Sequence, residues 1–242
     1  MDTSAKHQRT FLTADWNNLV MLNYAVDPSL LMRFIPKGTE LDLFEGNAYV
    51  SLVAFEFNNT RVAGIVIPFH RSFEEVNLRF YVKRGERRGV TFIRELVPRR
   101  AVAAVAQYFF NENYSRVPMS HRIHGNWSDE VVRAEYSWGA SASRCSIGVE
   151  AAAEEFLPGE GSHAQFITEH YWGYAAQPDG GCIEYEVQHP RWRIRQASTA
   201  EFRGNAARYY GADLAAALAG APYSAFLIEG SAVTVFNGAQ IR

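Results

Sequence analysis

The stretch Phe73–Arg84 constrains the fold of this 242-residue chain most, because its side chains alternate in polarity with a period of two. Successive side chains of a β-strand point to opposite faces, so the pattern predicts a strand with two unlike faces. The polar face either meets water or lines a polar cavity, and any hypothesis of function depends on which. One face comprises Val76, Leu78, Phe80 and Val82, and the other comprises Glu75, Asn77, Arg79, Tyr81 and Lys83.

Length and composition indicate one globular domain over residues 1–242, with residues 1–10 expected to be a loose tail. Hydrophobic residues make up 48% and charged residues 21%, an ordinary balance for a globular protein. The formal net charge of −2 and the sequence pI of about 6.4 provide no basic field for a phosphate backbone. We therefore expect no nucleic-acid partner.

The cysteine pattern and the apolar runs bear on the compartment. Cys145 and Cys182 are the only cysteines and form no CxxC pair, which favours a reducing compartment. The first residues lack the apolar segment of a secretory signal, and the longest apolar run, Val62–Pro68, is too short to span a membrane. We therefore expect a cytoplasmic protein without a membrane partner. Glycine-rich phosphate loops, dinucleotide fingerprints and serine nucleophile motifs do not occur, so we expect no cofactor.

The rest of the chain predicts about ten further strands and two or three helices, the pattern of a closed or nearly closed antiparallel sheet. Turn signals at Glu45–Asn47 and at Pro178–Gly181 predict two hairpins, and Pro190 implies an edge, a bulge or a strand end. Helices are expected at Pro28–Ile35, Pro98–Asn111 and Asn205–Ala219. The other expected strands are Trp16–Val26, Leu41–Phe44, Ala48–Asn58, Val90–Val97, Tyr114–Asn126, Glu130–Gly139, Ser143–Ala152, Phe166–Ala176, Ile183–Arg195 and Ser224–Phe236.

Several motifs together resemble the YqjF-like family, domain of unknown function 2071, within the acetoacetate decarboxylase-like superfamily. Their order and spacing match the family along almost the whole chain. The resemblance implies a mostly β, α+β fold: a cone-like antiparallel β-barrel with two or three flanking helices, enclosing a ligand cavity. The motifs that carry it are Val26–Leu31, Ile35–Asp42, Gly46–Val53, Glu75–Val82, Phe166–Tyr171 and His189–Trp192.

The resemblance also bears on chemistry. Acetoacetate decarboxylases use a Schiff-base lysine, but the corresponding segment here, Tyr114–His121, contains none. Thioether, hydroxyl and guanidinium groups cannot replace an amine nucleophile, so the Schiff-base mechanism does not carry over. These enzymes also place a glutamate on the strand that resembles Phe73–Arg84, and Glu75 is the residue that matches it.

The polar face of Phe73–Arg84 supplies the first candidate site. Arg79 could hold a carboxylate through two hydrogen bonds, while Glu75 could move a proton beside it, so these two are the candidate catalytic residues. Asn77 and Tyr81 would line the same cavity. Alternatively the face is wet, or Glu75 and Arg79 merely neutralise each other. Lys83 shares this face, but it lies at the strand end beside a charged turn, where an exposed lysine is expected.

Two later motifs supply a second candidate wall of the cavity, made of Glu169, Tyr171, His189 and Trp192. An acid or an imidazole would serve proton transfer there, and Trp192 would offer an aromatic surface to an apolar ligand. The alternative is a structural cluster in which Glu169 bonds the backbone or an arginine and Trp192 fills the core. A metal site is not expected, because the spacing of His121 and His124 sends them to opposite faces of a strand.

Three functions remain open from the sequence. The first is an enzyme acting on a small organic acid or related carbonyl compound. The second is a non-catalytic protein that binds a small organic ligand in the same cavity. The third is an interaction protein whose strand edges pair in a homo-oligomer.

Overall fold

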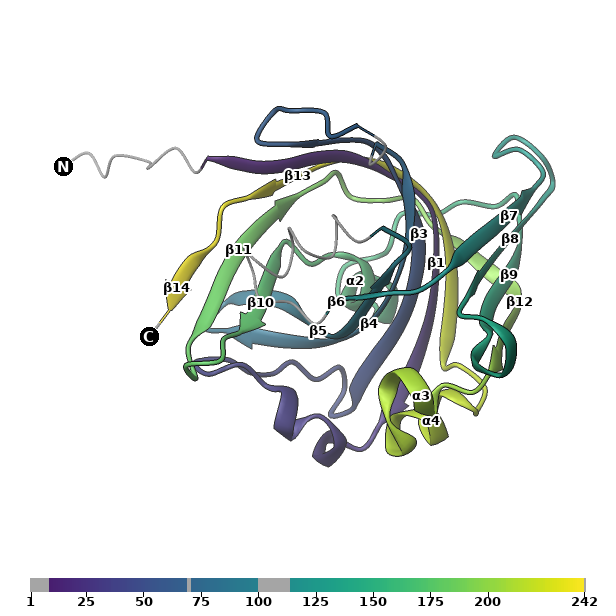
Figure 1. The fold of residues 1–242 in the computed structure, drawn as a ribbon. Helices are drawn as coiled ribbons and strands as arrows, with labels where there is room; N and C mark the ends of the chain where they lie inside the picture. The colour runs from purple at the N-terminus through teal and green to yellow at the C-terminus, as the bar shows by residue number, and fades with distance from the viewer. Residues whose placement is uncertain (1–8, 69–70, 100–113, 242) are drawn as a thin grey trace.

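The computed structural model describes residues 9–68, 71–99 and 114–241, and most of these residues lie in strands that curve into a ring (Figure 1). The pairing order around the ring is β11-β10-β5-β4-β3-β1-β13, and β13 pairs with β11 to close it. Neighbours in the ring are antiparallel, except that β10 meets β5 in parallel. The ring strands are β1 (Thr10–Val26), β3 (Ala48–Val62), β4 (Phe73–Arg84), β5 (Arg87–Val97), β10 (Trp172–Ala176), β11 (Cys182–Gln188) and β13 (Ser224–Phe236).

A second group of strands continues from β13 and packs outside the ring (Figure 1). Its order is β12-β9-β8-β7, and these are β7 (Met119–His124), β8 (Val131–Trp138), β9 (Cys145–Ala152) and β12 (Arg195–Gly204). Ile147 and Tyr136 of this group share one hydrophobic core with Leu52 and Leu78 of the ring. Apolar side chains of α3 (Ala207–Tyr210) and α4 (Ala212–Leu218) join the same core.

Strand β4 has the two unlike faces that the period of two predicts. Val76, Leu78, Phe80 and Val82 all belong to the outer core, between the ring and the second group of strands. Phe73 and Tyr81 belong to a separate inner cluster, which is lined by the other face of the ring strands. The alternation therefore directs one row of β4 side chains into the outer core and the other row into the ring.

Short elements complete the fold. β6 (Tyr114–Arg116) pairs in parallel with β5, β2 (Glu40–Leu41) pairs with β4, and β14 (Ala239–Ile241) pairs with β11. Helix α2 (His163–Thr168) is capped by the hydroxyl of Ser162, which accepts a hydrogen bond from Gln165 N. Single 3-10 turns occupy Pro28–Leu30, Met32–Phe34 and Ser141–Ser143.

Two predicted hairpin and strand assignments are wrong. Leu41 pairs with Val82 of β4 and not with β3, because the tight Phe44–Asn47 turn closes through only one bridge. The predicted strand Tyr114–Asn126 divides into β6 and β7, which belong to different parts of the sheet. Pro118 lies at the break, where its missing N–H interrupts the ladder.

Two other predicted strands are shorter in the structure. The strand predicted over Ile183–Arg195 ends at Gln188, just before Pro190, and Arg195 begins β12 in the second group. The first residues of the predicted strand Phe166–Ala176 belong to α2, and the strand itself, β10, begins only at Trp172.

The expected helices are also shorter. The helix predicted over Asn205–Ala219 is split at Gly211, whose φ of 83° leaves the helical region. The one predicted over Pro28–Ile35 is two 3-10 turns, and Asp27 accepts the predicted capping bond from Ser29 N at 2.8 Å. Most of the helix predicted over Pro98–Asn111, and most of the predicted tail, lie outside the described residues.

Candidate functional site: a pocket inside the strand ring

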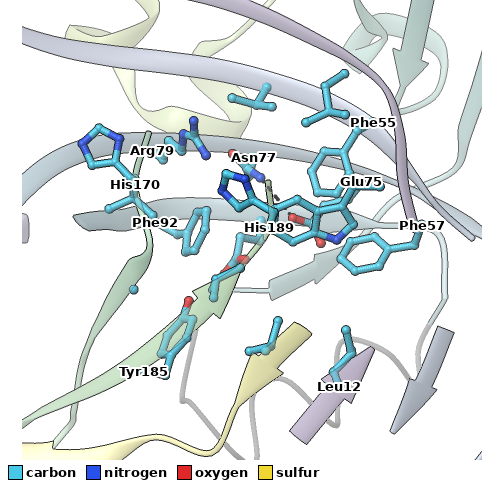
Figure 2. A pocket seen from close by; sticks show the side chains of 18 of the residues that line it. Leu12, Phe55, Phe57, Glu75, Asn77, Arg79, Phe92, His170, Tyr185 and His189 are labelled. Atoms are coloured by element: carbon cyan, nitrogen blue, oxygen red, sulfur yellow. Dashed lines mark hydrogen bonds between the residues drawn. The ribbon is translucent and has the colours of Figure 1, made fainter. Parts of the chain in front are cut away.

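A pocket opens inside the ring and encloses about 1340 Å³ of empty space, including the part open to solvent. Side chains from β1, β3, β4, β5, β10, β11 and β13 line it, together with the segment between β11 and β12. Most of the lining is apolar or aromatic, with a small number of polar side chains among them (Figure 2). Such a combination is typical of small-molecule sites, where a few polar groups fix the orientation of a ligand.

The polar row of β4 reaches this pocket. Glu75, Asn77 and Arg79 all line it, and the structure thereby brings together three of the residues predicted from the sequence. Glu75 and Asn77 are each only 3% exposed. Asn77 Nδ2 donates to Glu75 Oε1 at 3.0 Å, and the hydroxyl of Tyr114 donates to Glu75 Oε2 at 3.1 Å.

The surroundings of Glu75 favour its neutral form. Burial raises the pKa of the Glu75 carboxyl to about 7, although the hydrogen bonds from Asn77 and Tyr114 act in the opposite direction. No basic side chain in the described part of the chain forms an ion pair with it. Glu75 and Arg79 therefore do not neutralise each other directly. A carboxyl group that titrates near pH 7 can both accept and return a proton.

Arg79 lies at the opposite end of the polar row of β4 from Glu75, and His170 lies at the same end of the pocket (Figure 2). Arg79 donates one hydrogen bond, from Nη2 to the carbonyl of Ile167 at 3.3 Å, and its Nε is buried without a partner among the described residues. His170 is 7% exposed, and neither ring nitrogen has a partner there. Desolvation lowers the pKa of His170 well below its usual value, and the cations Arg88 and Arg79 lower it further. This end thus offers a guanidinium and a neutral imidazole to a ligand.

His189 and Trp192 form part of the opposite wall. Their rings are stacked at 3.9 Å with an interplanar angle of 9°, and both residues line the pocket. Trp192 is fixed by a hydrogen bond from Nε1 to Ser231 Oγ at 2.8 Å. Burial lowers the pKa of His189, so its ring presents an uncharged surface. Of the four residues of the second candidate wall, these two line the pocket.

Three other predicted cavity residues do not line the pocket. Tyr81 is buried beside it, where its hydroxyl shares a hydrogen bond with Ser51 and its ring lies 4.7 Å from that of His170. Glu169 pairs with Arg191 at 2.7 Å, which is the structural alternative considered above. The ring of Tyr171 packs against that of His189, with the centroids 5.0 Å apart. These side chains support the wall and do not reach its surface.

Several lining residues were missed from the sequence. His170 belongs to the Phe166–Tyr171 motif but has no local ligand spacing. Glu95 of β5 is 1% exposed and lies opposite Asn77 in the sheet register. Trp16, Phe55 and Phe57 look like ordinary core residues in strands that are apolar on both faces. Only the pairing of β1 with β3 and of β3 with β4 brings them to the pocket.

No lysine of the described residues lines the pocket. Lys83 lies at the end of β4, where its Nζ is 3.4 Å from Glu40 Oε1 and its side chain is 39% exposed. Lys37 is exposed, and Lys6 falls outside the described residues. The site therefore lacks the amine that an imine mechanism needs within the part of the chain described here.

Within residues 9–68, 71–99 and 114–241, no three His, Cys, Asp or Glu side chains gather in a way that could hold a metal ion. His121 and His124 alternate along β7 as predicted, the first half-buried and the second exposed. None of the helices described is long and apolar enough to cross a lipid bilayer.

Solved structures with a similar fold share little sequence with this chain. An enduracididine biosynthesis enzyme, MppR, complexed with pyruvate, superposes with a TM-score of 0.68 over 98% of this chain and 93% of that one, at 14% identity. Acetoacetate decarboxylase from Legionella pneumophila gives a TM-score of 0.64 over 100% and 92%, at 10% identity. An acetoacetate decarboxylase-like enzyme from Sphingomonas wittichii gives 0.65 over 96% and 94%, at 10% identity. The expected acetoacetate decarboxylase-like, mostly β fold is confirmed.

Sequence comparison identifies closer relatives. The protein YqjF of Bacillus subtilis is 27% identical over 183 residues, which cover 75% of this chain and 74% of YqjF. Residues 13–230 match DUF2071, a family described as "Uncharacterized conserved protein". This match spans all the ring strands except the ends of β1 and β13. The chain therefore belongs to the DUF2071 family.

Proposed function

We propose that this protein is an enzyme that binds a small organic acid or related carbonyl compound in the pocket and transfers a proton on it. The observation that carries the proposal is the position of Glu75, a buried carboxyl in an apolar pocket with its pKa raised to about 7. A general base is most effective when its pKa is close to the working pH. Strongly perturbed carboxyl groups in pockets are therefore candidates for catalysis.

Arg79 and Glu75 have different roles in this proposal. Arg79 binds the carboxylate of the substrate, because its Nε is buried without a partner in the described structure. Glu75 removes a proton from the carbon beside the substrate carbonyl. The C–H electron pair moves to the carbonyl oxygen and gives an enolate, and Arg79 stabilises that charge. Return of the proton from Glu75 completes the cycle without any change of oxidation state.

The structural neighbours support the choice of substrate class. One of them is described in complex with pyruvate, and two others are acetoacetate decarboxylase or a similar enzyme. The lack of a pocket lysine among the described residues separates the present proposal from imine catalysis. Proton transfer by a carboxyl group needs no such amine.

A second candidate function is non-catalytic binding in the same pocket. The observation in its favour is the lining, in which apolar and aromatic side chains greatly outnumber polar ones. In that case Glu75 would only hydrogen-bond the ligand. The two candidates agree on the pocket and differ on whether a proton moves.

The deciding experiment is hydrogen–deuterium exchange at C3 of 2-oxo acids in D₂O, followed by proton NMR. An enzyme should accelerate exchange, and Glu75→Gln should abolish it because an amide cannot accept the proton. Arg79→Met should raise the acid concentration needed for half-maximal exchange by at least about tenfold. Arg33→Met serves as the control, since Arg33 is exposed and does not line the pocket.

Two results would contradict proton transfer. The first is exchange at the same rate in Glu75→Gln and in the unaltered protein. The second is saturable binding of the acids, measured by calorimetry, without any exchange above the buffer rate. The second result would leave the non-catalytic binder as the function.

A further inference from the structure

One end of the pocket is walled by aromatic rings that contact one another. Trp16 lies 5.1 Å from Phe55, 5.7 Å from Phe57 and 6.3 Å from Trp192, measured between ring centroids. Phe57 stacks on Phe73 at 4.8 Å with an interplanar angle of 14°. All five residues line the pocket, and we call them the aromatic wall. An arrangement of this kind provides both stacked and edge-on positions for a further ring.

The sheet register places the aromatic wall relative to the charged groups. Phe55 lies opposite Glu75, and Phe57 lies opposite Phe73. Arg79 is four residues further along β4, so its Cα is about 13 Å from that of Glu75. Figure 2 shows Phe55 and Phe57 on one side of the pocket and Arg79 on the other.

A short acid cannot use both ends of this pocket. Three carbon atoms in a row span only about 4 Å even with their oxygens included. A pyruvate-sized molecule held at Arg79 would leave the aromatic wall uncovered, and one held at the aromatic wall would leave the guanidinium without an anion. Because Arg79 and the aromatic wall line the same pocket, only a longer molecule can contact both.

We propose that the ligand is an aryl-substituted oxo acid, with its carboxylate at Arg79 and its aromatic ring against the aromatic wall. This inference rests on the proposed function and specifies its substrate class. The carbon between the carbonyl and the ring then lies at the level of Glu75. Its C–H bond is flanked by two groups that delocalise negative charge, so it is the most acidic C–H bond of such a molecule. Proton removal gives an enolate conjugated with the ring, and the removed proton resides on Glu75.

The aromatic end also has a hydrogen-bond donor. Trp16 Nε1 is buried and has no hydrogen-bond partner among the described residues. A buried donor without a partner carries a free-energy cost that a ligand acceptor would remove. A ring with a hydroxyl or carbonyl substituent on its edge therefore suits this site better than an unsubstituted one.

The test compares pyruvate, phenylpyruvate and 2-oxo-4-phenylbutyrate by calorimetry. We expect at least one of the aryl acids to bind at least about tenfold more tightly than pyruvate, because the aromatic wall buries the ring. Phe57→Leu should reduce this preference by at least about threefold, because it removes one ring of the aromatic wall. Phe44→Leu is the matched control, since Phe44 belongs to a different ring cluster with Tyr49 and Phe166 and does not line the pocket.

The outcomes separate this inference from the proposed function. Equal affinity for all three acids, with weaker binding in Arg79→Met, overturns the aryl inference alone. Tight aryl binding that is insensitive to Arg79→Met overturns the carboxylate clamp, and with it both the proposed function and the placement of the aryl acid. Loss of the aryl preference in Phe44→Leu to the same extent as in Phe57→Leu also overturns the inference. Failure of every acid to bind at millimolar concentration overturns both.

Discussion

Asn77 Nδ2 donates a hydrogen bond to Glu75 Oε1 at 3.0 Å, and the two side chains share one buried face of β4. An amide can bond a carboxyl group in either protonation state, because it carries both donors and an acceptor. Asn77 is therefore a suitable partner for a carboxyl whose pKa is raised to about 7. An arginine in that position would instead hold Glu75 permanently ionised.

The first prediction concerns the pH dependence of stability. Burial raises the pKa of Glu75 from 4.5 to about 7, so the folded state binds its proton more tightly than the unfolded state. The contribution of this group to the free energy of unfolding is therefore present below pH 4.5 and falls as the pH rises to 7. Its total is of the order of 3 kcal/mol. Urea unfolding should show the free energy of unfolding of Glu75→Gln rising relative to that of the unaltered protein as the pH increases from 4.5 to 7.

A matched control is Glu40→Gln, because the Glu40 side chain is 70% exposed and forms a surface ion pair with Lys83. Its stability difference from the unaltered protein should change little between pH 5 and pH 8. If the free energies of unfolding of Glu75→Gln and the unaltered protein differ by the same amount at every pH, the carboxyl of Glu75 has the same pKa in the folded and unfolded states. Its proposed role as a base at neutral pH would then have no physical basis.

The second prediction concerns imine formation. Borohydride treatment in the presence of 2-oxo acids should leave no adduct on Lys83, because its amine pairs with Glu40 outside the pocket lining. Lys83→Met should exchange substrate protons at the same rate as the unaltered protein. Peptide mapping by mass spectrometry checks each lysine separately, Lys6 included. A stable adduct on Lys83 that disappears in Lys83→Met would show that the chain does use amine chemistry.

The third prediction concerns the contact between Gly173 and Tyr185 on neighbouring strands. A Cβ at Gly173 would overlap the ring of Tyr185, and both residues line the pocket. Gly173→Ala should therefore destabilise the fold by about 1–3 kcal/mol, the usual cost of overpacking. It should also weaken ligand binding by displacing the Tyr185 ring. Thermal and urea unfolding measure the first effect, and calorimetry measures the second.

Two further variants test the cause of this effect. Gly159→Ala should be nearly neutral, because a Cβ there meets nothing within 4 Å. Adding Tyr185→Leu to Gly173→Ala should recover part of the lost stability, since the smaller side chain removes the overlap. An equal loss of stability with and without Tyr185→Leu would point to a backbone effect at Gly173.

Parts of the fold could be predicted from the sequence because they depend on local patterns. The alternation along Phe73–Arg84 gave the bounds of β4 and its division into two faces. The strand predicted over Ser224–Phe236 has the same bounds in the structure. The motifs of the family resemblance led to the DUF2071 family, which the match over residues 13–230 confirms.

Other parts depend on which distant strands meet, and no local pattern carries that information. Leu41 and Val82 pair although 40 residues separate them, and the local turn at Glu45–Asn47 suggested a different partner. The aromatic wall likewise requires Trp16 to meet Phe57 across the sheet. Glu75 and Arg79 could be chosen because they share one strand face, whereas His170 comes from a separate segment without any spacing signal.

The last prediction concerns the contact between the second group of strands and the ring. His121 of β7 lies 2.9 Å from Glu74 Oε1 through Nδ1 and 3.2 Å from Glu56 Oε2 through Nε2. The hydrogen bond with Glu74, together with the charges of Glu56 and Glu74, raises the pKa of His121, although burial opposes the change. The stabilisation of the folded state by His121 is therefore complete below pH 6.5 and is lost as the pH rises through the raised pKa of this residue.

His121→Gln should remove this dependence on pH. Since the His121 side chain is a third exposed, solvent screening limits the effect to less than about 1 kcal/mol. Unfolding by urea at pH 6 and at pH 8.5 should show the unaltered protein losing stability relative to His121→Gln as the pH rises. His124→Gln is the control, because His124 is exposed and none of the bonds to Glu56 or Glu74 involves it. If instead the unaltered protein gained stability relative to His121→Gln as the pH rose, His121 would not form a charged contact with Glu56 and Glu74. Only a protonated imidazole is stabilised by two carboxylates.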